Sequence, residues 1–147
     1  MRNAEKSELI QNLVKNFSKL ERRQRHFMKD ALKSAGLQGV MYKYIITIKI
    51  NPGTNQDYLA EFHSVDKSRV ARIVRELEKM GYLSRSPNEK DRRSHQLFLT
   101  PEGERLYIII KQKLLDWGTI ISSSISSDDI SFTSSTIDTM ITNASNI

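Results

Sequence analysis

The apolar positions of the chain change their spacing several times, and each change predicts a new structural element. In the N-terminal part, an apolar side chain recurs every three or four residues: Leu9, Leu13, Phe17 and Leu20. This is the period of one face of an α-helix, so we expect a long amphipathic helix over residues 5–33. Gly36 and Gly39 follow, and glycines at such places are typical of a helix end.

The next apolar run, residues 40–50, fits either a strand or a helix. Its β-branched composition suits a strand, whereas its length is that of a buried helix. The tripeptide Asn51-Pro52-Gly53 ends the run, because proline and glycine interrupt both kinds of element.

Two helices separated by a tight break are expected next. The first begins at Thr54 or Asn55, whose side chains accept a hydrogen bond from a free helix N–H. Its apolar side consists of Tyr58, Leu59 and Phe62. His63-Ser64 forms the break, and the second helix runs from Asp66, a good capping residue, to Met80. Gly81 ends it, because glycine tolerates a positive φ angle.

Residues 82–100 change from the helical period to an alternating one. We expect a β-hairpin in which Tyr82-Leu83 leads into a charged loop over residues 85–95, with Pro87-Asn88 in the turn. Thr100-Pro101 then begins a second long helix, since proline suits the first helical position. The apolar positions of this helix are Leu106, Ile110, Leu114 and Trp117.

The tail, residues 118–147, is rich in serine and threonine, which are poor helix formers. Ile130, Ile137 and Ile141 nevertheless keep helical spacing, and Ser127-Asp128-Asp129 suits a helix start. We therefore expect a final helix that depends on packing rather than on propensity, with disorder as the alternative.

Charge is distributed unevenly along the chain, whose formal net charge is +6. Residues 1–36 hold nine Lys/Arg and four Asp/Glu, and residues 64–93 hold nine and five. Residues 118–147 hold three Asp and no Lys or Arg. Two basic segments indicate a polyanionic partner, nucleic acid first and an anionic membrane surface second. For residues 1–36, a merely solvated face is the competing interpretation.

The helix from Asp66 has two contrasting faces. At helical spacing its buried stripe consists of Val70, Ile73, Val74 and Leu77. Its opposite face consists of Ser68, Arg72, Arg75 and Lys79, with Arg69 at the edge and Lys67 beside the stripe. The major groove admits one α-helix and displays acceptors that arginine can bind in bidentate fashion. A short helix, a tight break and this second helix indicate a helix-turn-helix.

The hairpin offers a second contact with DNA. Its tip has the sequence Glu89-Lys90-Asp91-Arg92-Arg93. A cation on an extended loop suits a narrow minor groove, where the negative potential is strongest. Asp91 fits this site only if it pairs with an arginine and holds it in position.

Five short motifs then carry a family resemblance. They are Leu59-Ala60-Glu61, Val65-Asp66-Lys67-Ser68, Leu77-Glu78-Lys79-Met80-Gly81-Tyr82-Leu83, Asp91-Arg92-Arg93 and Leu99-Thr100-Pro101-Glu102-Gly103. In this order and spacing the chain resembles the MarR family of transcriptional regulators (multiple antibiotic resistance regulators). The resemblance implies a mainly α fold, a winged helix-turn-helix with a two-stranded wing, flanked by N- and C-terminal dimerisation helices.

The resemblance also implies functional roles for individual residues. The proposed DNA-binding set is Lys67, Ser68, Arg69, Arg72, Arg75, Arg92 and Arg93, with Asp91 as the wing partner. Many members of the family bind a small anionic or aromatic effector and release DNA. Tyr42, Tyr58 and Phe62 are candidates for such a pocket, although aromatic residues at these places equally suit a core. The Ser/Thr-rich tail departs from the usual last dimerisation helix.

Several classes of function are disfavoured by the residues present. The chain has no cysteine, which excludes disulfides, thiolate zinc sites and a cysteine redox switch. His26, His63 and His95 are dispersed without metal-ligand spacing, so each is expected at a surface or turn. No phosphate-binding glycine loop or nucleophile elbow occurs, so we expect neither an enzyme nor a cofactor. No signal peptide or membrane span is expected, which places the protein in the cytoplasm.

The expected function is that of a homodimeric regulator, a repressor, which binds a pseudo-palindromic site on double-stranded DNA. We expect dimerisation helices over residues 1–36 and 101–147 and a DNA-binding lobe over residues 37–100. A non-specific nucleoid-type protein and a winged-helix module that binds another protein are the alternatives.

Overall fold

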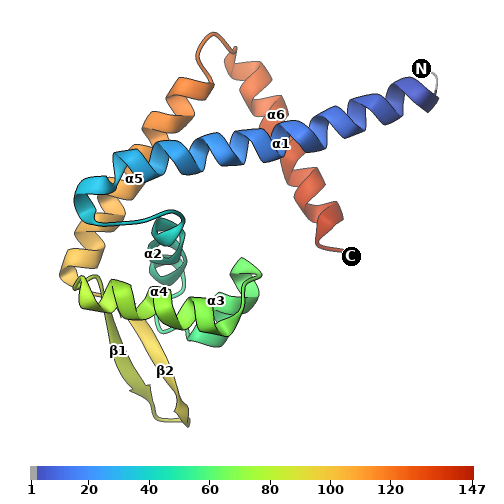
Figure 1. Ribbon diagram of the computed structural model, residues 1–147. Coiled ribbons are helices and arrows are strands. Elements are labelled where there is room, and N and C mark those ends of the chain that lie inside the picture. Colours follow the sequence, from blue (N-terminus) through green and yellow to red (C-terminus); the bar gives the residue numbers. More distant parts are fainter. Residues whose placement is uncertain (1–2) are drawn as a thin grey trace. The chain divides into compact units, whose positions relative to one another are not determined.

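The computed structural model describes residues 3–147 and consists mainly of helices with one small antiparallel sheet (Figure 1). In chain order the elements are α1 (Asn3–Ala31), a 3-10 turn η1 (Lys33–Ala35), α2 (Met41–Ile50), α3 (Gln56–His63), α4 (Lys67–Lys79), β1 (Leu83–Asn88), β2 (Asp91–Leu99), α5 (Pro101–Ile121) and α6 (Ser127–Ala144). The predicted mainly α fold with a two-stranded wing is confirmed.

The chain divides into two compact units, one that runs through Leu114 and one from Leu115 to Ile147. The boundary falls inside α5. None of the helices over residues 3–147 is both long enough and apolar enough to cross a membrane.

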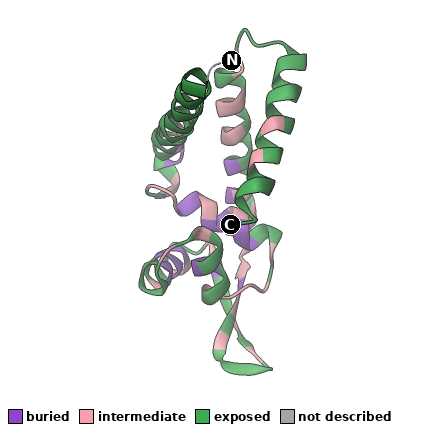
Figure 2. Cartoon of the chain, turned by 90° about the vertical axis from the view of Figure 1, so that its right-hand side faces the viewer, coloured by how far each residue is buried: buried purple, intermediate pink, exposed green. Residues whose placement is uncertain are grey.

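The core of the first unit lies around α2, which is the most buried helix (Figure 2). The apolar run at residues 40–50, which the sequence left undecided, is a helix and not a strand, and six of the ten residues of α2 are buried. Its burial on several sides explains why the run lacks a clear period. The core side chains around it include Met28, Leu32, Leu59, Val70, Val74, Leu77, Leu97, Leu106 and Ile110.

The hairpin β1–β2 is longer than the sequence suggested, because much of the expected charged loop is strand. Pro87 lies in β1 opposite His95, and the turn consists of Glu89 and Lys90. The prediction of a Pro87-Asn88 turn was therefore wrong. Proline is tolerated here because each strand of a two-stranded sheet has a free outer edge, where a missing N–H leaves no ladder partner unpaired.

The start of α5 packs closely on the end of the helix-turn-helix. Pro101 is the first residue of α5, and the Thr100 hydroxyl oxygen accepts a hydrogen bond from the Gly103 amide at 3.1 Å. This confirms the predicted helix start. A Cβ atom on Gly103 would lie 2.1 Å from the Tyr82 carbonyl oxygen, so only glycine permits this approach.

The second unit contains α6, which confirms the expected final helix. The cap is Ser126, one residue before the predicted start, and its hydroxyl oxygen accepts from the Asp129 amide at 3.1 Å. Several hydroxyls in α6 donate to carbonyls one turn earlier, as Thr136 does to Phe132 at 2.8 Å and Thr142 to Asp138 at 3.0 Å. No residue of α6 is buried.

Candidate nucleic-acid interface

The helix-turn-helix formed by α3 and α4 is fixed by two side-chain caps. The Asn55 side chain accepts from the Tyr58 amide at 2.8 Å, and the Asp66 carboxylate accepts from the Arg69 amide at 2.8 Å. Ser64, between the two helices, adopts a left-handed conformation with φ of 52°. Its neighbour Val65 donates its amide to the Ala60 carbonyl at 3.0 Å. Both predicted caps, at Asn55 and Asp66, are thereby confirmed.

The Asp66 carboxylate also organises the first turn of α4. The Ser68 hydroxyl donates to it, and this hydrogen bond, followed by that from the Arg69 amide, lowers the pKa of Asp66. Asp66 is therefore a carboxylate at neutral pH and holds the helix start in place. Because the Ser68 hydroxyl proton is donated to Asp66, the Ser68 oxygen can only accept a hydrogen bond from DNA.

The faces of α4 agree with the helical spacing. Val70, Ile73, Val74 and Leu77 are buried. Every proposed DNA-binding side chain of this helix is exposed: Lys67, Ser68, Arg69, Arg72 and Arg75. The amphipathic pattern thus sends the apolar stripe into the core and the cations outward.

The exposed cations of α4 differ in their partners. Lys67 pairs with Asp57 of α3 at 3.0 Å, and the Arg75 side chain donates to the Ala71 carbonyl at 3.3 Å. Arg72 makes no hydrogen bond or ion pair within residues 3–147. Arg72 and Arg69 line an open hollow of about 500 Å³ beside Gln38 and Gly39 of the α1–α2 connection. Arg72 is thus free to bind an external acceptor.

The hairpin is anchored to the helix-turn-helix at its base. Leu97 of β2 is fully buried, donates its amide to the Thr54 carbonyl at 2.8 Å and accepts from the Gly53 amide at 2.9 Å. On the other strand, Arg85 pairs with Glu78 of α4 at 2.8 Å. The sequence analysis did not identify this pair, since Arg85 was assigned to the loop. These contacts fix the hairpin relative to α3 and α4.

The tip of the hairpin is irregular where the wing arginines lie. The register shifts between Pro87, which pairs with His95, and Asn88, which pairs with Asp91. Arg92 and Arg93 fall in the extra length of β2 and are exposed. A bulge of this kind redirects side chains away from the ladder.

Asp91 contacts Arg93 differently from the expected pairing of side chains. Its carboxylate accepts from the Arg93 backbone amide at 3.0 Å and makes no ion pair within residues 3–147. Asp91 therefore shapes the backbone of the tip and leaves the Arg93 guanidinium unpaired.

The aromatic residues proposed for an effector pocket have separate surroundings. Tyr42 is buried on α2, where its hydroxyl oxygen accepts from the Gln24 side chain at 3.4 Å, and burial raises its pKa. Tyr58 and Phe62 are exposed on α3 and stack on each other with ring centroids 5.8 Å apart. Of the expected apolar side of α3, only Leu59 enters the core.

His63 lies at the end of α3 before the turn at Ser64, as expected, but its half-buried ring also packs against α2. It stacks on Tyr44 with centroids 4.3 Å apart, and its Nε2 lies 3.1 Å from the Thr47 hydroxyl oxygen. Thr47 donates its own proton to the Lys43 carbonyl at 2.9 Å. With the Thr47 proton used in this way, the hydrogen bond between Thr47 and His63 is donated by the N–H of the His63 Nε2 and accepted by the Thr47 hydroxyl oxygen. Over residues 3–147, no three His, Cys, Asp or Glu side chains gather as a metal site.

Comparison with known proteins gives one consistent family. The model of the MarR family matches residues 40–95, which include the helix-turn-helix and most of the hairpin. A helix-turn-helix transcriptional regulator from Clostridioides difficile, BilQ, is 30% identical over 120 residues, which are 82% of this chain and 76% of that protein. An uncharacterized regulator from Bacillus subtilis, YybA, is 32% identical over 81 residues, 55% of this chain and 54% of that one.

The solved structures extend the likeness to nearly the whole chain. A MarR transcriptional regulator from Methanosarcina mazei Go1 superposes with a TM-score of 0.88 at 26% identity. The superposition covers 92% of this chain and 98% of that one. By contrast, the sequence match spans only about half the length of the Bacillus relative. From the fold, the order of the motifs and the Clostridioides relative together, we conclude that the chain belongs to the MarR family of transcriptional regulators.

Proposed function

We propose that the protein is a sequence-specific DNA-binding repressor that acts as a homodimer on a pseudo-palindromic operator. The observation that carries this proposal is the exposed face of α4, where Arg72 has no hydrogen-bond or ion-pair partner among residues 3–147, on a helix that is capped by Asp66 and packed on the core. Arginine on a helix of this kind suits the N7 and O6 acceptors of guanine in the major groove.

The remaining cations are assigned by their position. Lys67 and Arg69, at the start of α4, suit the DNA backbone and the nearest base edges, because a helix N-terminus favours phosphate. Ser68, whose proton is donated to Asp66, suits a donor on a base edge, such as an amino group. Arg75 lies farther along the same exposed face. Arg92 and Arg93 would enter the minor groove beside the operator, with Asp91 shaping the tip of the wing.

Exposed apolar surface supports the homodimer. On α1 the side chains of Leu9, Leu13, Phe17 and Leu20 are 38–58% exposed. The second unit exposes Phe132 to 73% and Ile141 to 59%. Apolar surface of this extent marks a contact with another chain. Members of the MarR family act as dimers, and we propose residues 1–36 and 101–147 as the dimerisation segments.

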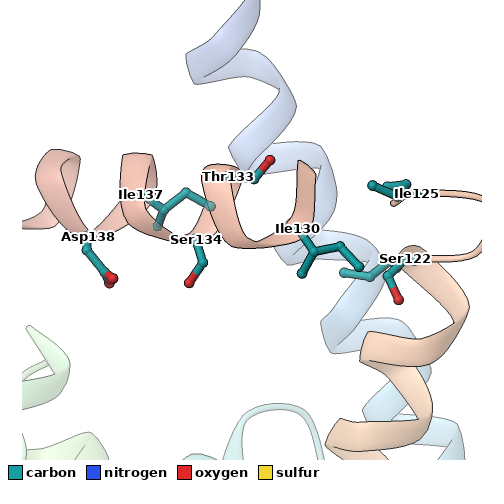
Figure 3. A pocket seen from close by; sticks show the side chains of 8 residues that line it. Ser122, Ile125, Ile130, Thr133, Ser134, Ile137 and Asp138 are labelled. Atoms are coloured by element: carbon teal, nitrogen blue, oxygen red, sulfur yellow. The ribbon is translucent and has the colours of Figure 1, made fainter. Parts of the chain in front are cut away.

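The second unit also contains an open apolar hollow of about 300 Å³ (Figure 3). It is lined mainly by isoleucines, including Ile125, Ile130 and Ile137, with Asp138 at its edge. The exposed apolar face of α1, formed by Leu9, Leu13, Phe17 and Leu20, matches this lining, which favours α1 of a second copy as the occupant of the hollow.

An effector step belongs to the same proposal. A small aromatic anion that binds near Tyr42, or near the Tyr58–Phe62 pair, would release DNA by favouring another arrangement of the two winged lobes. Isothermal titration with aromatic carboxylates, on the wild type and on Tyr42→Phe, tests this step. Binding that is the same for both proteins argues against Tyr42 as a ligand of the effector.

The experiment that tests the function is selection from sheared genomic DNA at a salt concentration of about 0.15 M, where purely electrostatic binding is already weakened. We expect recovery of a few imperfect palindromes. Recovery of fragments without common sequence would contradict the proposal and favour a nucleoid-type protein. Recovery of no DNA would also contradict it and favour a module that binds another protein.

The wing is tested on the recovered site. Arg93→Ala should lower affinity by about 1 to 3 kcal/mol if its guanidinium makes the expected contact. Fluorescence anisotropy at several salt concentrations measures the change, with Arg105→Ala on α5 as the control for lost charge. Equal affinity and salt dependence for Arg93→Ala and wild type would show that the wing arginine does not touch DNA.

A further inference from the structure

The outward face of α1 carries a row of four cations and one histidine that the proposed operator contact does not use. Lys15, Lys19, Arg22, His26 and Lys29 are all exposed and follow one another at spacings of four and three residues. At about 100° per residue they fall within an arc of about 80°, and at 1.5 Å per residue they extend over about 21 Å. We call these five residues the basic stripe.

The basic stripe lies opposite the apolar face of the same helix. Leu9, Leu13, Phe17 and Leu20 share an arc centred roughly 160° away at about 100° per residue. If the apolar face forms the dimer contact, as proposed above, the basic stripe stays on the surface of the dimer. The inference below rests on the proposed function in this respect.

The cations of the stripe are largely free of acidic partners. Lys15, Lys19, Arg22 and Lys29 make no ion pair within residues 3–147, and His26 contacts Asp30 at 3.6 Å. Elsewhere on α1, Arg25 is already paired with Glu21 at 3.4 Å. Glu8 lies in line with the stripe about two turns before Lys15, and Glu5 and Asp30 lie on the same side of α1.

The end of the stripe approaches the cations of α4 through one loop. Lys29, Asp30 and Lys33 line an open groove of about 680 Å³ together with the connection from Gly36 to Gly39. Gln38 and Gly39 of this connection also line the hollow that contains Arg69 and Arg72. One short loop therefore separates the end of the basic stripe from the face of α4 that we assign to the operator.

We propose that the basic stripe is a second, sequence-independent DNA contact, which binds the phosphates of duplex that flanks the operator. Phosphate binding requires cations at intervals along a surface and little else. A protein partner requires aromatic or other apolar anchors, and the stripe contains none. Lys29, at the end of the stripe, lines a groove that shares Gln38 and Gly39 with the hollow of Arg69 and Arg72, which favours duplex held by α4 as the partner.

The test compares the recovered operator with the same operator extended by about 12 base pairs of random duplex on each side, more than one DNA turn. The stripe variant is Lys15→Gln/Lys19→Gln/Arg22→Gln. The control variant, Lys49→Gln/Arg105→Gln/Lys111→Gln, removes the same charge from exposed sites of α2 and α5. Because Arg105 and Lys111 lie in a proposed dimerisation segment, sedimentation velocity verifies that both variants stay dimeric. Anisotropy titrations between 50 and 200 mM salt measure affinity, and thermal melts verify folding.

We expect the wild type and the control variant to bind the extended duplex more tightly than the trimmed one. The stripe variant should bind both equally and keep wild-type affinity for the trimmed operator. Each phosphate contact steepens the slope of log affinity against log salt concentration by about 0.9. On the extended duplex, three such contacts make the fall in affinity between 50 and 200 mM salt about 40-fold larger for the wild type than for the stripe variant.

Two results would overturn the inference while the proposed function stands. One is equal wild-type affinity for the two duplexes, and the other is an undiminished gain from flanks in the stripe variant. If the stripe variant binds both duplexes as the wild type does but no longer represses in cells, the stripe binds an acidic protein and not DNA. If no operator is recovered, the proposed function fails, and random duplexes of the two lengths still test the stripe.

Discussion

Individual side chains at the helix-turn-helix act mainly by fixing the backbone. Asp66, Asn55 and Asp91 each place a side-chain oxygen on an amide two or three residues later. These hydrogen bonds replace those that a helix start or a turn leaves unmade. The Arg69, Arg72 and Arg93 side chains are exposed and make no ion pair within residues 3–147, which leaves them available to bind DNA.

The side chain of His63 should make the stability of the folded protein depend on pH. Burial, followed by the charge of Lys43, lowers the pKa of His63, so the folded protein favours the neutral ring. The unfolded chain then binds more protons, and stability rises with pH across this range. The contribution of His63 is present above its unfolded pKa of about 6.5 and is lost as pH falls through the lower folded value.

The change that tests this is His63→Gln, which keeps a donor for Thr47 but does not titrate. We expect the wild type to lose more stability than the variant between about pH 7 and pH 5, as measured by urea midpoints. An unchanged pH dependence in His63→Gln would show that the ring tolerates protonation in the folded state.

At the scale of elements, close packing links the hairpin to α5. A methyl group on Gly103 would meet the Tyr82 carbonyl at 2.1 Å, whereas one on Gly118 would meet no heavy atom within 4 Å. Gly103→Ala should therefore lower the free energy of unfolding by about 1 to 3 kcal/mol, the usual cost of overpacking. Thermal and urea unfolding measure the effect.

The matched control is Gly118→Ala in the same helix. Alanine lowers the cost of helix formation by about 0.5 to 1 kcal/mol, so this variant should be as stable as the wild type or more so. A Gly103→Ala protein that is no less stable than Gly118→Ala would contradict the close approach of α5 to Tyr82.

The sequence predicted elements well where the apolar period is regular. It predicted α1, α4 and α5 because one face is apolar and the other polar, and it predicted the outward cations of α4 for the same reason. It left residues 40–50 undecided, because a helix buried on several sides shows no period. Pro87 was assigned to a turn because proline in a strand becomes acceptable only when the strand has a free edge.

Side-chain partners that are distant in sequence were the part that could not be predicted. The stacking of His63 on Tyr44 and the pairing of Arg85 with Glu78 depend on how α2, α3, α4 and β1 meet. For Asp91, a backbone amide two residues away competes with any arginine side chain, and no pattern decides between them. The helical spacing of the isoleucines correctly predicted α6. The surface against which these isoleucines pack could not be predicted, because it does not belong to α6 itself.

For the whole molecule, the distribution of apolar surface predicts dependence on a second copy. Leu13 and Phe17 are each nearly two-fifths exposed in a single chain, at 38% and 39%. Leu13→Glu/Phe17→Glu would place two charges in the proposed interface, where burial without a partner is costly. We expect these substitutions to convert the dimer to a monomer in sedimentation velocity.

The control for the dimer is Gln11→Glu, which adds a negative charge to the opposite face of α1. This variant should sediment as the wild type does. A Leu13→Glu/Phe17→Glu protein that remains dimeric would show that α1 does not contribute its apolar face to the contact. The wild type as a monomer at all concentrations would contradict the proposed homodimer itself.

The central claim is that α4 reads base sequence through Arg72, and parallel selections from random duplex test it most directly. Wild type and Arg72→Ala are each used to select sites at about 0.15 M salt, where non-specific binding is weakened. We expect both proteins to recover paired half-sites with the same spacing, and Arg72→Ala to lose the preference at one or two positions in each half. An identical consensus from both proteins would contradict base recognition by Arg72 and require that sequence be read elsewhere.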